Sequence, residues 1–396
     1  MLIGIVGKPN VGKSTFFKAL TMIPVEIDNR PFVTIKPNYG IGYVRVKEPS
    51  FELNLKVNPR TGYIKGKYRF VPIEIMDVAG LVPGAHEGKG LGNKFLDDLR
   101  QAEGFIMVID IVGATNEEGI YIGKGNYDPI NDIKFLEEEL DWWFFRIIKE
   151  NLDKIIRKAK NERKSIIKEL ANVLSGINIS EEEIREAFKE LKIDEYTYDF
   201  DEKTIFELAK ILRKNKKFVI AANRVDIDID LAKNNIEKIK RGYPDKIIIP
   251  TSAQAELILK ELDKQGKIEY IPGEKDIIIK GNLNDKEKKA IEIIKMIIEE
   301  FDSTGVQITL EKLVFDLLNY IPVFPVATEK YTDTEGNILP DCYLVKKGTT
   351  ALDLAYKIHT ELGKNFVKAR ELRFKKIVGK DYILENGDII QIISSH

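Results

Sequence analysis

Short apolar runs alternate with helical patterns along much of the chain. Unbroken apolar runs are typical of strands buried on both faces, and strands separated by helices pair in parallel. The pattern therefore predicts an α/β fold with a doubly wound, mostly parallel sheet. The predicted strands are LIGIVG at 2–7, FVPIEIMD at 70–77, FIMVID at 105–110, FVIAAN at 218–223 and KIIIPTS at 246–252.

The strand pattern is interrupted between Asp110 and Lys217, where apolar residues spaced three and four apart predict long amphipathic helices. Helical patterns at 285–301 and 307–320 then lead into IPVFP, whose two prolines indicate a boundary. Beyond it, the strand-like CYLVK and DIIQIIS flank the amphipathic helix ALDLAYKIHTEL, which predicts a small α+β module. The predicted domains are residues 1–112 with 216–275 for the doubly wound domain, 113–215 for a helical insertion, 276–320 for a helical connector packing on the first domain, and 321–396 for the C-terminal module.

The composition indicates the class of protein and the cellular compartment. The 396 residues are 43% hydrophobic and 32% charged with a formal net charge of −1, as in a soluble multidomain protein. One cysteine, Cys342, excludes an internal disulfide and a multi-cysteine zinc site, and it fits a reducing compartment. We see no export leader and no apolar stretch near the ~20 residues that span a bilayer. We therefore expect a cytoplasmic protein that does not enter the membrane.

Residues 7–14, GKPNVGKS, fit the phosphate-loop pattern G-x-x-x-x-G-K-[ST], between a predicted strand and a predicted helix. Gly7 and Gly12 would permit the turn, Lys13 would neutralise the phosphates, and the Ser14 hydroxyl would bind Mg²⁺. The N–H groups along the loop would surround the β-phosphate. The remaining predicted nucleotide-binding positions in the loop are Lys8, Pro9, Asn10, Val11 and Thr15.

A second signal for a nucleotide is Asp-x-x-Gly, which occurs five times, beginning at Asp77, Asp110, Asp263, Asp302 and Asp333. These five matches differ only in where they lie relative to the predicted strands. Asp77 ends a predicted strand and opens DVAG, which places it at the carboxyl edge of the sheet as a Mg²⁺ ligand. Gly80 would then offer its N–H to the γ-phosphate, and the glycine-rich stretch after it would be a switch or an ordinary flexible loop. Asp110 also ends a strand and is the serious rival.

A third signal, Asn-x-x-Asp, would recognise the nucleotide base. This motif follows a predicted buried strand only at Asn223–Asp226. Guanine presents donors at N1 and N2 that one carboxylate accepts as a pair, whereas adenine presents an acceptor at N1. Asp226 would therefore bind guanine and repel adenine. Ser252 and Ala253, in the TSA that follows the next strand, would complete a GTP site.

The motifs GKPNVGKSTFF, PFVTIKPNYG, DVAGLVPGAHEGKGLGNKFLDDLR and LVKKGTTALDLAYKIHTELGKNFVKA resemble those of the Obg-like GTPases of the YchF type, close to archaeal members. The resemblance covers the nucleotide domain and the tail. It implies a P-loop GTPase with a helical insertion, a C-terminal β-grasp (TGS) domain and association with the ribosome. It also makes Thr34 the switch threonine that meets Mg²⁺.

Two residues depart from the family pattern. Bacterial and eukaryotic YchF proteins carry Asn-x-x-Glu and prefer ATP, so Asp226 favours GTP, and an adenine-nucleotide hydrolase is the alternative. Arg224 replaces the usual lysine, and its stem and guanidinium could still cover the base.

Leu81 stands where the water-positioning glutamine usually follows Asp-x-x-Gly, so we expect slow intrinsic turnover or another catalytic group. Asn10 matches the asparagine with which potassium-dependent relatives hold a monovalent cation; a loop residue bonding its own backbone is the alternative. His86 could orient water, or it could be an exposed loop histidine without a role. The predicted catalytic set is Lys13, Asn10, Gly80 and His86.

Two basic runs are candidate contacts for ribosomal RNA, KIIRKAKNERKSIIK at 154–168 and KNFVKARELRFKKIVGK at 364–380. A charge run on a helix is usually a solvated face, which we favour for the insertion, whereas the resemblance favours RNA contact for the TGS domain. The expected ligands are GTP and GDP with Mg²⁺, and K⁺ as a further candidate; we expect a monomer. The competing hypotheses are an interaction module that binds GTP with negligible hydrolysis and a phosphotransferase acting on a small metabolite.

Overall fold

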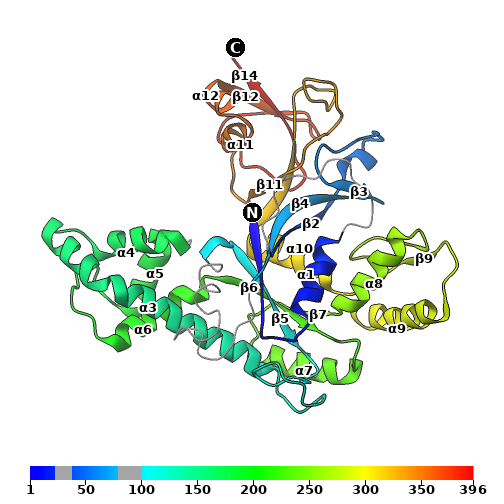
Figure 1. Ribbon diagram of the computed structural model, residues 1–396. Helices are drawn as coiled ribbons and strands as arrows, with labels where there is room; N and C mark the ends of the chain where they lie inside the picture. The colour runs from blue at the N-terminus through cyan, green and yellow to red at the C-terminus, as the bar shows by residue number, and fades with distance from the viewer. Residues whose placement is uncertain (23–37, 79–99, 178, 396) are drawn as a thin grey trace.

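The computed structural model describes residues 1–22, 38–78, 100–177 and 179–395. Its centre is a seven-stranded sheet in the order β2-β4-β1-β5-β6-β7, with β3 added to β4 (Figure 1). The pairs from β4 to β7 are parallel, as the apolar runs predict, while β2 and β3 are antiparallel to β4. The strands are β1 (Leu2–Val6), β2 (Tyr39–Lys47), β3 (Tyr63–Lys65), β4 (Tyr68–Asp77), β5 (Gly104–Asp110), β6 (Lys217–Asn223) and β7 (Ile248–Thr251).

The sheet separates two apolar cores. Alternate residues of β5 divide between them: Phe105 and Met107 face the core shared with the helical insertion, and Ile106 and Val108 face the other. Every residue of β5 is buried, which explains why its sequence is apolar without alternation. The elements around the sheet are α1 (Lys13–Thr21), the short 3₁₀ turn η1 (Pro49–Phe51), α7 (Ile229–Gly242), α8 (Ala253–Lys264) and α10 (Val306–Glu311).

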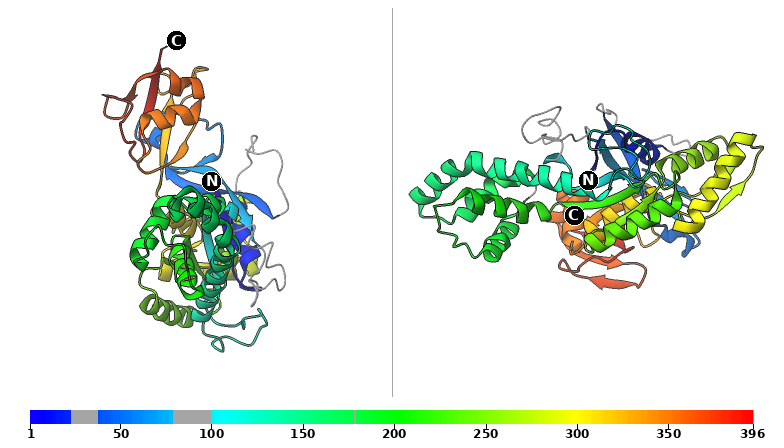
Figure 2. Two further views of the ribbon diagram at one scale, coloured as in Figure 1. Left: turned by 90° about the vertical axis from the view of Figure 1, so that its left-hand side faces the viewer. Right: turned by 90° about the horizontal axis from the view of Figure 1, so that it is seen from below.

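The helical insertion forms an arm on one side of the sheet, and the α8–α9 region extends on the opposite side (Figures 1 and 2). Buried residues of α3, spaced as the sequence predicts, pack against α6 and continue the core of the sheet. The segment 113–127, predicted to belong to the insertion, contacts the loop after β1 through Thr115 and Gly119. The arm consists of α3 (Ile130–Glu162), α4 (Ile166–Leu174), the turn η3 (Ser175–Ile177), α5 (Glu181–Leu191) and α6 (Glu202–Lys214).

A two-stranded sheet of β8 (Ile268–Tyr270) and β9 (Ile277–Ile279) spans the predicted start of the connector at 276. The helical pattern at 285–301 is confirmed as α9 (Asp285–Phe301), whose first turn is closed by a capping box between Asn284 and Glu287. The helix predicted over 307–320 is only partly confirmed. There α10 passes into a π-helical turn, η4 (Lys312–Leu317), and a strand begins at Tyr320.

The C-terminal module is a five-stranded sheet in the order β11-β10-β14-β12-β13. Its first strand, β10, begins at Tyr320, next to the predicted boundary at IPVFP, and both prolines of that motif lie inside the strand. Pro322 lies where β10 pairs with β11 alone and Pro325 where it pairs with β14 alone, so neither lies between two paired neighbours. The elements are β10 (Tyr320–Val326), β11 (Tyr343–Lys346), α11 (Ala351–Ile358), α12 (Thr360–Lys364), β12 (Phe366–Glu371), β13 (Lys376–Val378) and β14 (Ile389–Ser394).

The single helix expected from ALDLAYKIHTEL is interrupted at His359, whose backbone is extended (φ −160°, ψ 137°). The His359 Nδ1 accepts a hydrogen bond from the Glu361 N–H and so caps the second short helix. This histidine therefore has a local structural role.

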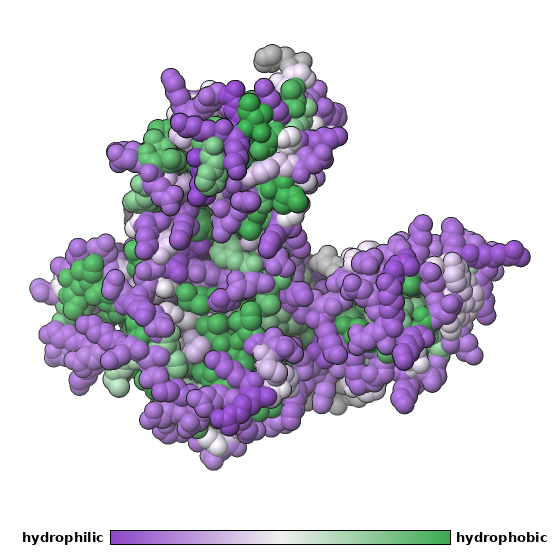
Figure 3. All heavy atoms as spheres, turned by 180° about the vertical axis from the view of Figure 1, so that it is seen from behind, coloured by the Kyte–Doolittle hydropathy of each residue, from purple (hydrophilic) through white to green (hydrophobic). Residues whose placement is uncertain are grey.

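Hydrophilic side chains cover most of the face seen in Figure 3, and apolar side chains gather in the middle, where the lobes meet. Among the described residues, none of the helices combines the length and the apolar character needed to cross a bilayer.

A buried ion pair joins the C-terminal module to the central sheet. Arg69 on β4 donates to Glu48 at 2.5 Å and, through its other arm, to the Leu339 carbonyl at 2.8 Å. Both side chains of the pair are at most 1% exposed. Near it, Arg60 pairs with Asp333 and Asp341, but half of its side chain is exposed.

Replacing Arg69 by Met should lower the free energy of unfolding by roughly 3 to 5 kcal/mol, because the Glu48 carboxylate would stay buried without its cation. Arg60→Ala, which removes an exposed arginine at the same junction, should cost less than about 1 kcal/mol. Denaturant titration of the full chain measures both. Equal losses would show that burial of the Arg69 pair is not what holds the module.

Candidate nucleotide site

The phosphate loop, residues 7–12, joins the end of β1 to the first turn of α1, and both of its glycines are required by close contacts. A side-chain carbon on Gly7 would come within 2.5 Å of the Val108 carbonyl oxygen. Gly12 has φ +91°, and a carbon there would come within 2.5 Å of the Asn223 Nδ2. The loop is thus packed between the ends of β5 and β6, as the motif predicts.

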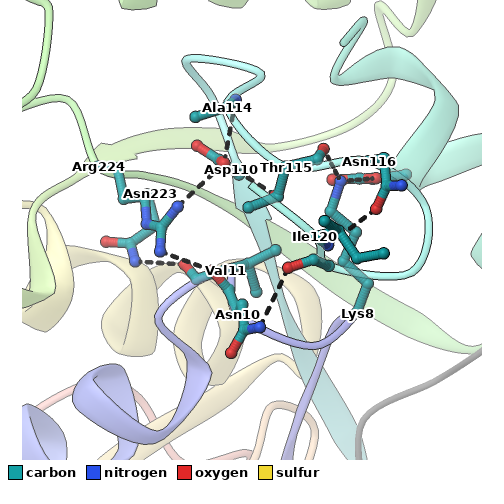
Figure 4. Close-up of polar contacts among 12 residues, drawn as sticks. Lys8, Asn10, Val11, Asp110, Ala114, Thr115, Asn116, Ile120, Asn223 and Arg224 are labelled. Atoms are coloured by element: carbon teal, nitrogen blue, oxygen red, sulfur yellow. Dashed lines mark hydrogen bonds and ion pairs between the residues drawn. The ribbon is translucent and has the colours of Figure 1, made fainter. Parts of the chain in front are cut away.

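Two side chains turn the carbonyl groups of the loop outward (Figure 4). Arg224 Nη2 donates to the Asn10 carbonyl at 2.6 Å, and Asn223 Nδ2 donates to the Val11 carbonyl at 2.9 Å. In a trans peptide the N–H points opposite to the C=O, so the next N–H groups, those of Val11 and Gly12, face the interior of the loop. Together with the amino end of α1 they form a concave set of donors suited to phosphate oxygens.

The predicted metal ligands that the structure describes lie together. The Ser14 hydroxyl is 3.4 Å from the Asp77 Oδ2. The Lys13 ammonium pairs with the Asp77 carboxylate and donates to the Val78 carbonyl at 2.6 Å. A hydroxyl and a carboxylate beside a phosphate loop are the hard oxygen donors that suit Mg²⁺, so these residues fit that ion.

Asp110, the rival of Asp77, has a different position. It is fully buried behind the phosphate loop and accepts hydrogen bonds from the Thr115 hydroxyl at 2.9 Å and from Arg224 at 3.0 Å. Both of these hydrogen bonds go to its Oδ2, and Asp77 is the carboxylate that reaches Ser14.

The residues predicted to read guanine meet one strand farther along the sheet. The Ser252 hydroxyl donates to the Asp226 Oδ1 at 2.6 Å and caps α8 by accepting from the Ala255 N–H at 3.1 Å. Asn223 is buried, and its oxygen accepts from the Ala253 N–H at 3.0 Å. Asn223 therefore holds the loops together, while Asp226 is half-buried and is oriented by Ser252.

Three of the predicted site residues have side chains that bond to other parts of the protein. Arg224 does not lie free to cover a base, because its guanidinium bridges Asp110 and Asn10. Asn10 bonds another segment instead of its own backbone, donating from Nδ2 to the Gly119 carbonyl at 3.0 Å. Lys8 points away from the loop interior, with its Nζ 2.8 Å from both the Thr115 carbonyl and Asp132.

The pair of Lys8 and Asp132 is buried at the first turn of α3. Burial raises the pKa of the Asp132 carboxyl to about 6, although Lys8 beside it acts in the opposite direction. The Lys8 ammonium also lies 3.9 Å from the centre of the Tyr127 ring. The phosphate loop is thus linked directly to the long helix of the insertion.

Sequence reasoning missed the segment 113–127, which lies along the outer side of the phosphate loop. Thr115 and Gly119 contact the loop through their carbonyl groups, and Lys124 pairs with Asp228, two residues after the predicted base reader Asp226. The signal available was a set of closely spaced glycines, of which Gly113 and Gly119 have positive φ and backbone within 2.5 Å of where a side-chain carbon would lie.

Four residues named from the sequence lie outside the described residues: the Mg²⁺ ligand Thr34, the γ-phosphate donor Gly80, Leu81 and His86. Their assigned roles stay predictions. For Pro9 and Thr15 the structure supports only their place in the loop and in the first turn of α1.

Three family descriptions match consecutive parts of the chain. Residues 2–142 match "50S ribosome-binding GTPase", residues 221–328 match "Obg-like GTPase YGR210-like, G4 motif-containing domain", and residues 331–394 match "TGS domain". The predicted P-loop domain and C-terminal TGS domain are confirmed.

Relatives match over nearly the whole length. An uncharacterized GTP-binding protein of Methanocaldococcus jannaschii is 48% identical over 100% of this chain and 99% of its own. An uncharacterized GTP-binding protein of Schizosaccharomyces pombe is 37% identical, covering 89% of this chain and 88% of its own. The Obg-like ATPase 1 of chicken is 27% identical over 98% and 91%.

Among solved structures, a GTP-binding protein from Pyrococcus horikoshii is 38% identical and superimposes with a TM-score of 0.79, covering 100% of both chains. The Schizosaccharomyces pombe YchF GTPase shares the fold, with a TM-score of 0.59 and 22% identity over 99% of this chain and 97% of its own. The phosphate loop, the TGS domain and these full-length matches agree with the resemblance seen in the motifs. The chain belongs to the YchF-type, Obg-like family of GTP-binding proteins.

Proposed function

We propose that the protein hydrolyses GTP to GDP and phosphate with the help of Mg²⁺, and that it acts as a ribosome-associated switch. The observation that carries this proposal is the convergence of Lys13, Ser14 and Asp77 at the sheet edge where Asp226 is held by Ser252. Phosphate contacts, metal ligands and a base reader are then arranged along one edge, in the order in which a nucleotide presents these groups.

In this proposal each residue performs a limited task. The N–H groups of the loop and the Lys13 ammonium hold the β- and γ-phosphates, and Ser14 and Asp77 hold the metal, with Thr34 as a third ligand. Mg²⁺, when bound, supplies positive charge to the oxygens of the transferred phosphoryl group. Positioning and charge neutralisation are most of what phosphoryl transfer requires, so turnover can proceed slowly without a glutamine at Leu81.

Guanine is the base that the geometry favours. The second oxygen of Asp226 carries no hydrogen bond from Ser252, and this carboxylate can accept both the N1 and the N2 protons of guanine. Adenine would place its N1 lone pair against the same negative charge. The relatives that are 48% and 37% identical are named GTP-binding, whereas relatives named ATPase are 27% and 28% identical.

Potassium is the further cofactor that we propose. With the Asn10 Nδ2 donated to Gly119, the side-chain oxygen is held in a fixed direction on the exposed side of the loop, and an amide oxygen is a suitable ligand for a monovalent cation. His86 stays a second candidate for a catalytic group. The competing function is that of an interaction module, in which bound GTP orders the switch segments and is not hydrolysed.

Replacing Asp226 by Asn should weaken GTP binding about hundredfold, as expected for the loss of about 3 kcal/mol of charge-assisted hydrogen bonding. Xanthosine triphosphate should bind better to the variant, because its O2 accepts a proton where guanine donates one. Competition binding measures both, and Asp228→Asn makes the same chemical change two residues away without altering base choice. Tighter binding of ATP than of GTP by the unaltered protein would contradict the assignment of Asp226.

Phosphate release from GTP should be at least about tenfold faster in K⁺ than in Na⁺, a change of about 1.4 kcal/mol in the barrier. Asn10→Gly should abolish the difference. Asn10 has φ +62°, so glycine removes the side-chain oxygen without straining the backbone. Equal rates in the two salts would exclude the potassium role, and no release with or without ribosomes would exclude the hydrolase.

Ribosomal subunits should retain the protein more strongly with a GTP analogue than with GDP. The β12–β13 hairpin carries exposed Lys375 and Lys376, and their replacement by Glu should weaken co-sedimentation and flatten its salt dependence. The same reversal at exposed Lys154 and Arg157 on α3 is the matched control and should have little effect. Equal losses in the two variants would assign the contact to net charge and not to the TGS domain.

A further inference from the structure

Asp110 is a buried carboxylate that none of the proposed steps uses. It lies at the carboxyl end of β5, directly opposite Asn223 in the register with β6. Its Oδ2 accepts hydrogen bonds from the Thr115 hydroxyl, from Arg224 and, at 3.2 Å, from the Ala114 N–H. Its Oδ1 is buried and has no hydrogen-bond partner among the described residues. A charge so placed costs free energy unless a cation compensates it, and Arg224 is the cation that does.

Two routes lead from Asp110 to the same residue of the phosphate loop (Figure 4). In the first, Arg224 uses one arm for Asp110 and the other for the Asn10 carbonyl. In the second, Asp110 holds the start of the segment 113–127, and farther along that segment the Gly119 carbonyl accepts from the Asn10 side chain. Asn10 is therefore held at two places: its backbone carbonyl accepts from Arg224, and its side-chain amide donates to Gly119.

The backbone at both ends of these routes is unusual. Arg224 has φ +73° and Asn10 has φ +62°, both in the left-handed region, which is costly for an arginine. Such conformations persist only where the surroundings determine them. The strained Arg224 backbone brings its guanidinium beneath the loop, where it reaches Asp110 and Asn10 together.

We propose that Asp110 is a positioning residue for the phosphate loop. By holding Arg224 and the segment 113–127 on either side of Asn10, it fixes the Val11 N–H toward the phosphates and sets the lifetime of the bound nucleotide. A loop that is already in its binding geometry loses less conformational entropy on binding, and the gain appears mainly as slower dissociation. The proposal needs nucleotide binding and not hydrolysis, so it stands apart from the hydrolase function.

The test is the dissociation rate of a fluorescent guanine nucleotide from the full chain. Asp110→Asn keeps the shape and an oxygen for Thr115 but removes the charge that orients Arg224. Arg224→Lys provides one ammonium where the guanidinium fork reaches two partners. Each variant should release nucleotide about tenfold faster than the unaltered protein. The double variant should be no faster than about twice the faster single variant, because both act on one route.

A matched pair serves as the control. Asp141 and Arg213 also form a buried ion pair, at 2.8 Å, but between α3 and α6, and Arg213 precedes the strand end opposite to the site. Asp141→Asn should affect thermal unfolding as Asp110→Asn does while leaving the release rate unchanged. The preference for GTP over ATP should be the same in all variants, because Asp226 and Ser252 are untouched.

Release from both Asp110→Asn and Arg224→Lys at the unaltered rate would overturn the proposal, and so would equally fast release from Asp141→Asn. If Asp110→Asn does not fold, Arg224→Lys decides alone. A chain that hydrolyses no GTP leaves the measurement valid, since release is followed with the bound nucleotide and not with its product.

Discussion

The parallel pairing of β4, β1, β5 and β6 is the constraint on which the candidate site depends. Register places Asp77 opposite Ile5, and Asp110 opposite Asn223. Strands buried on both faces cannot slide along one another without moving their hydrogen bonds and their apolar side chains. Residues far apart in sequence therefore end at one edge of the sheet, and the loops after these strands need only short reach to meet around a phosphate.

The same strands connect this edge to the TGS domain. β4 carries Asp77 at one end and Arg69 near the other, and Arg69 is buried against Glu48 and the Leu339 carbonyl. β2 pairs with β4 along nine residues, from Tyr39 to Lys47. The TGS domain is thus attached to the sheet by a desolvated ion pair and a shared apolar core, and moving it away would expose both.

The fold and the phosphate loop could be predicted largely from sequence because their signals are local. The five parallel strands contain short apolar runs, and glycine, lysine and serine occupy fixed places in the loop. Two features could not be predicted because the deciding contact is distant. Pro322 and Pro325 are tolerated inside β10 because each lies where only one neighbouring strand pairs, and His359 interrupts a helix that the apolar periodicity would continue.

The segment 113–127 could not be predicted for a different reason. Thr115 and Gly119 act through carbonyl oxygens, which every residue has, so their contacts leave little mark on residue type. The sequence makes Asp110 a candidate metal ligand, because its position at the end of a predicted strand is visible there. Its burial and its pairing with Arg224 are not, since both depend on how β5 and β6 lie side by side.

The arginine at 224 follows from this arrangement. A lysine ammonium is a compact charge that can lie against the Asn10 carbonyl or against Asp110, whereas the planar guanidinium offers separate N–H groups in a fork and reaches both. With a buried carboxylate at 110, a single point charge would leave either the carboxylate or the loop carbonyl poorly compensated. The departure from the usual lysine is therefore matched by a buried acid on the neighbouring strand, and the two residues are best understood as one unit.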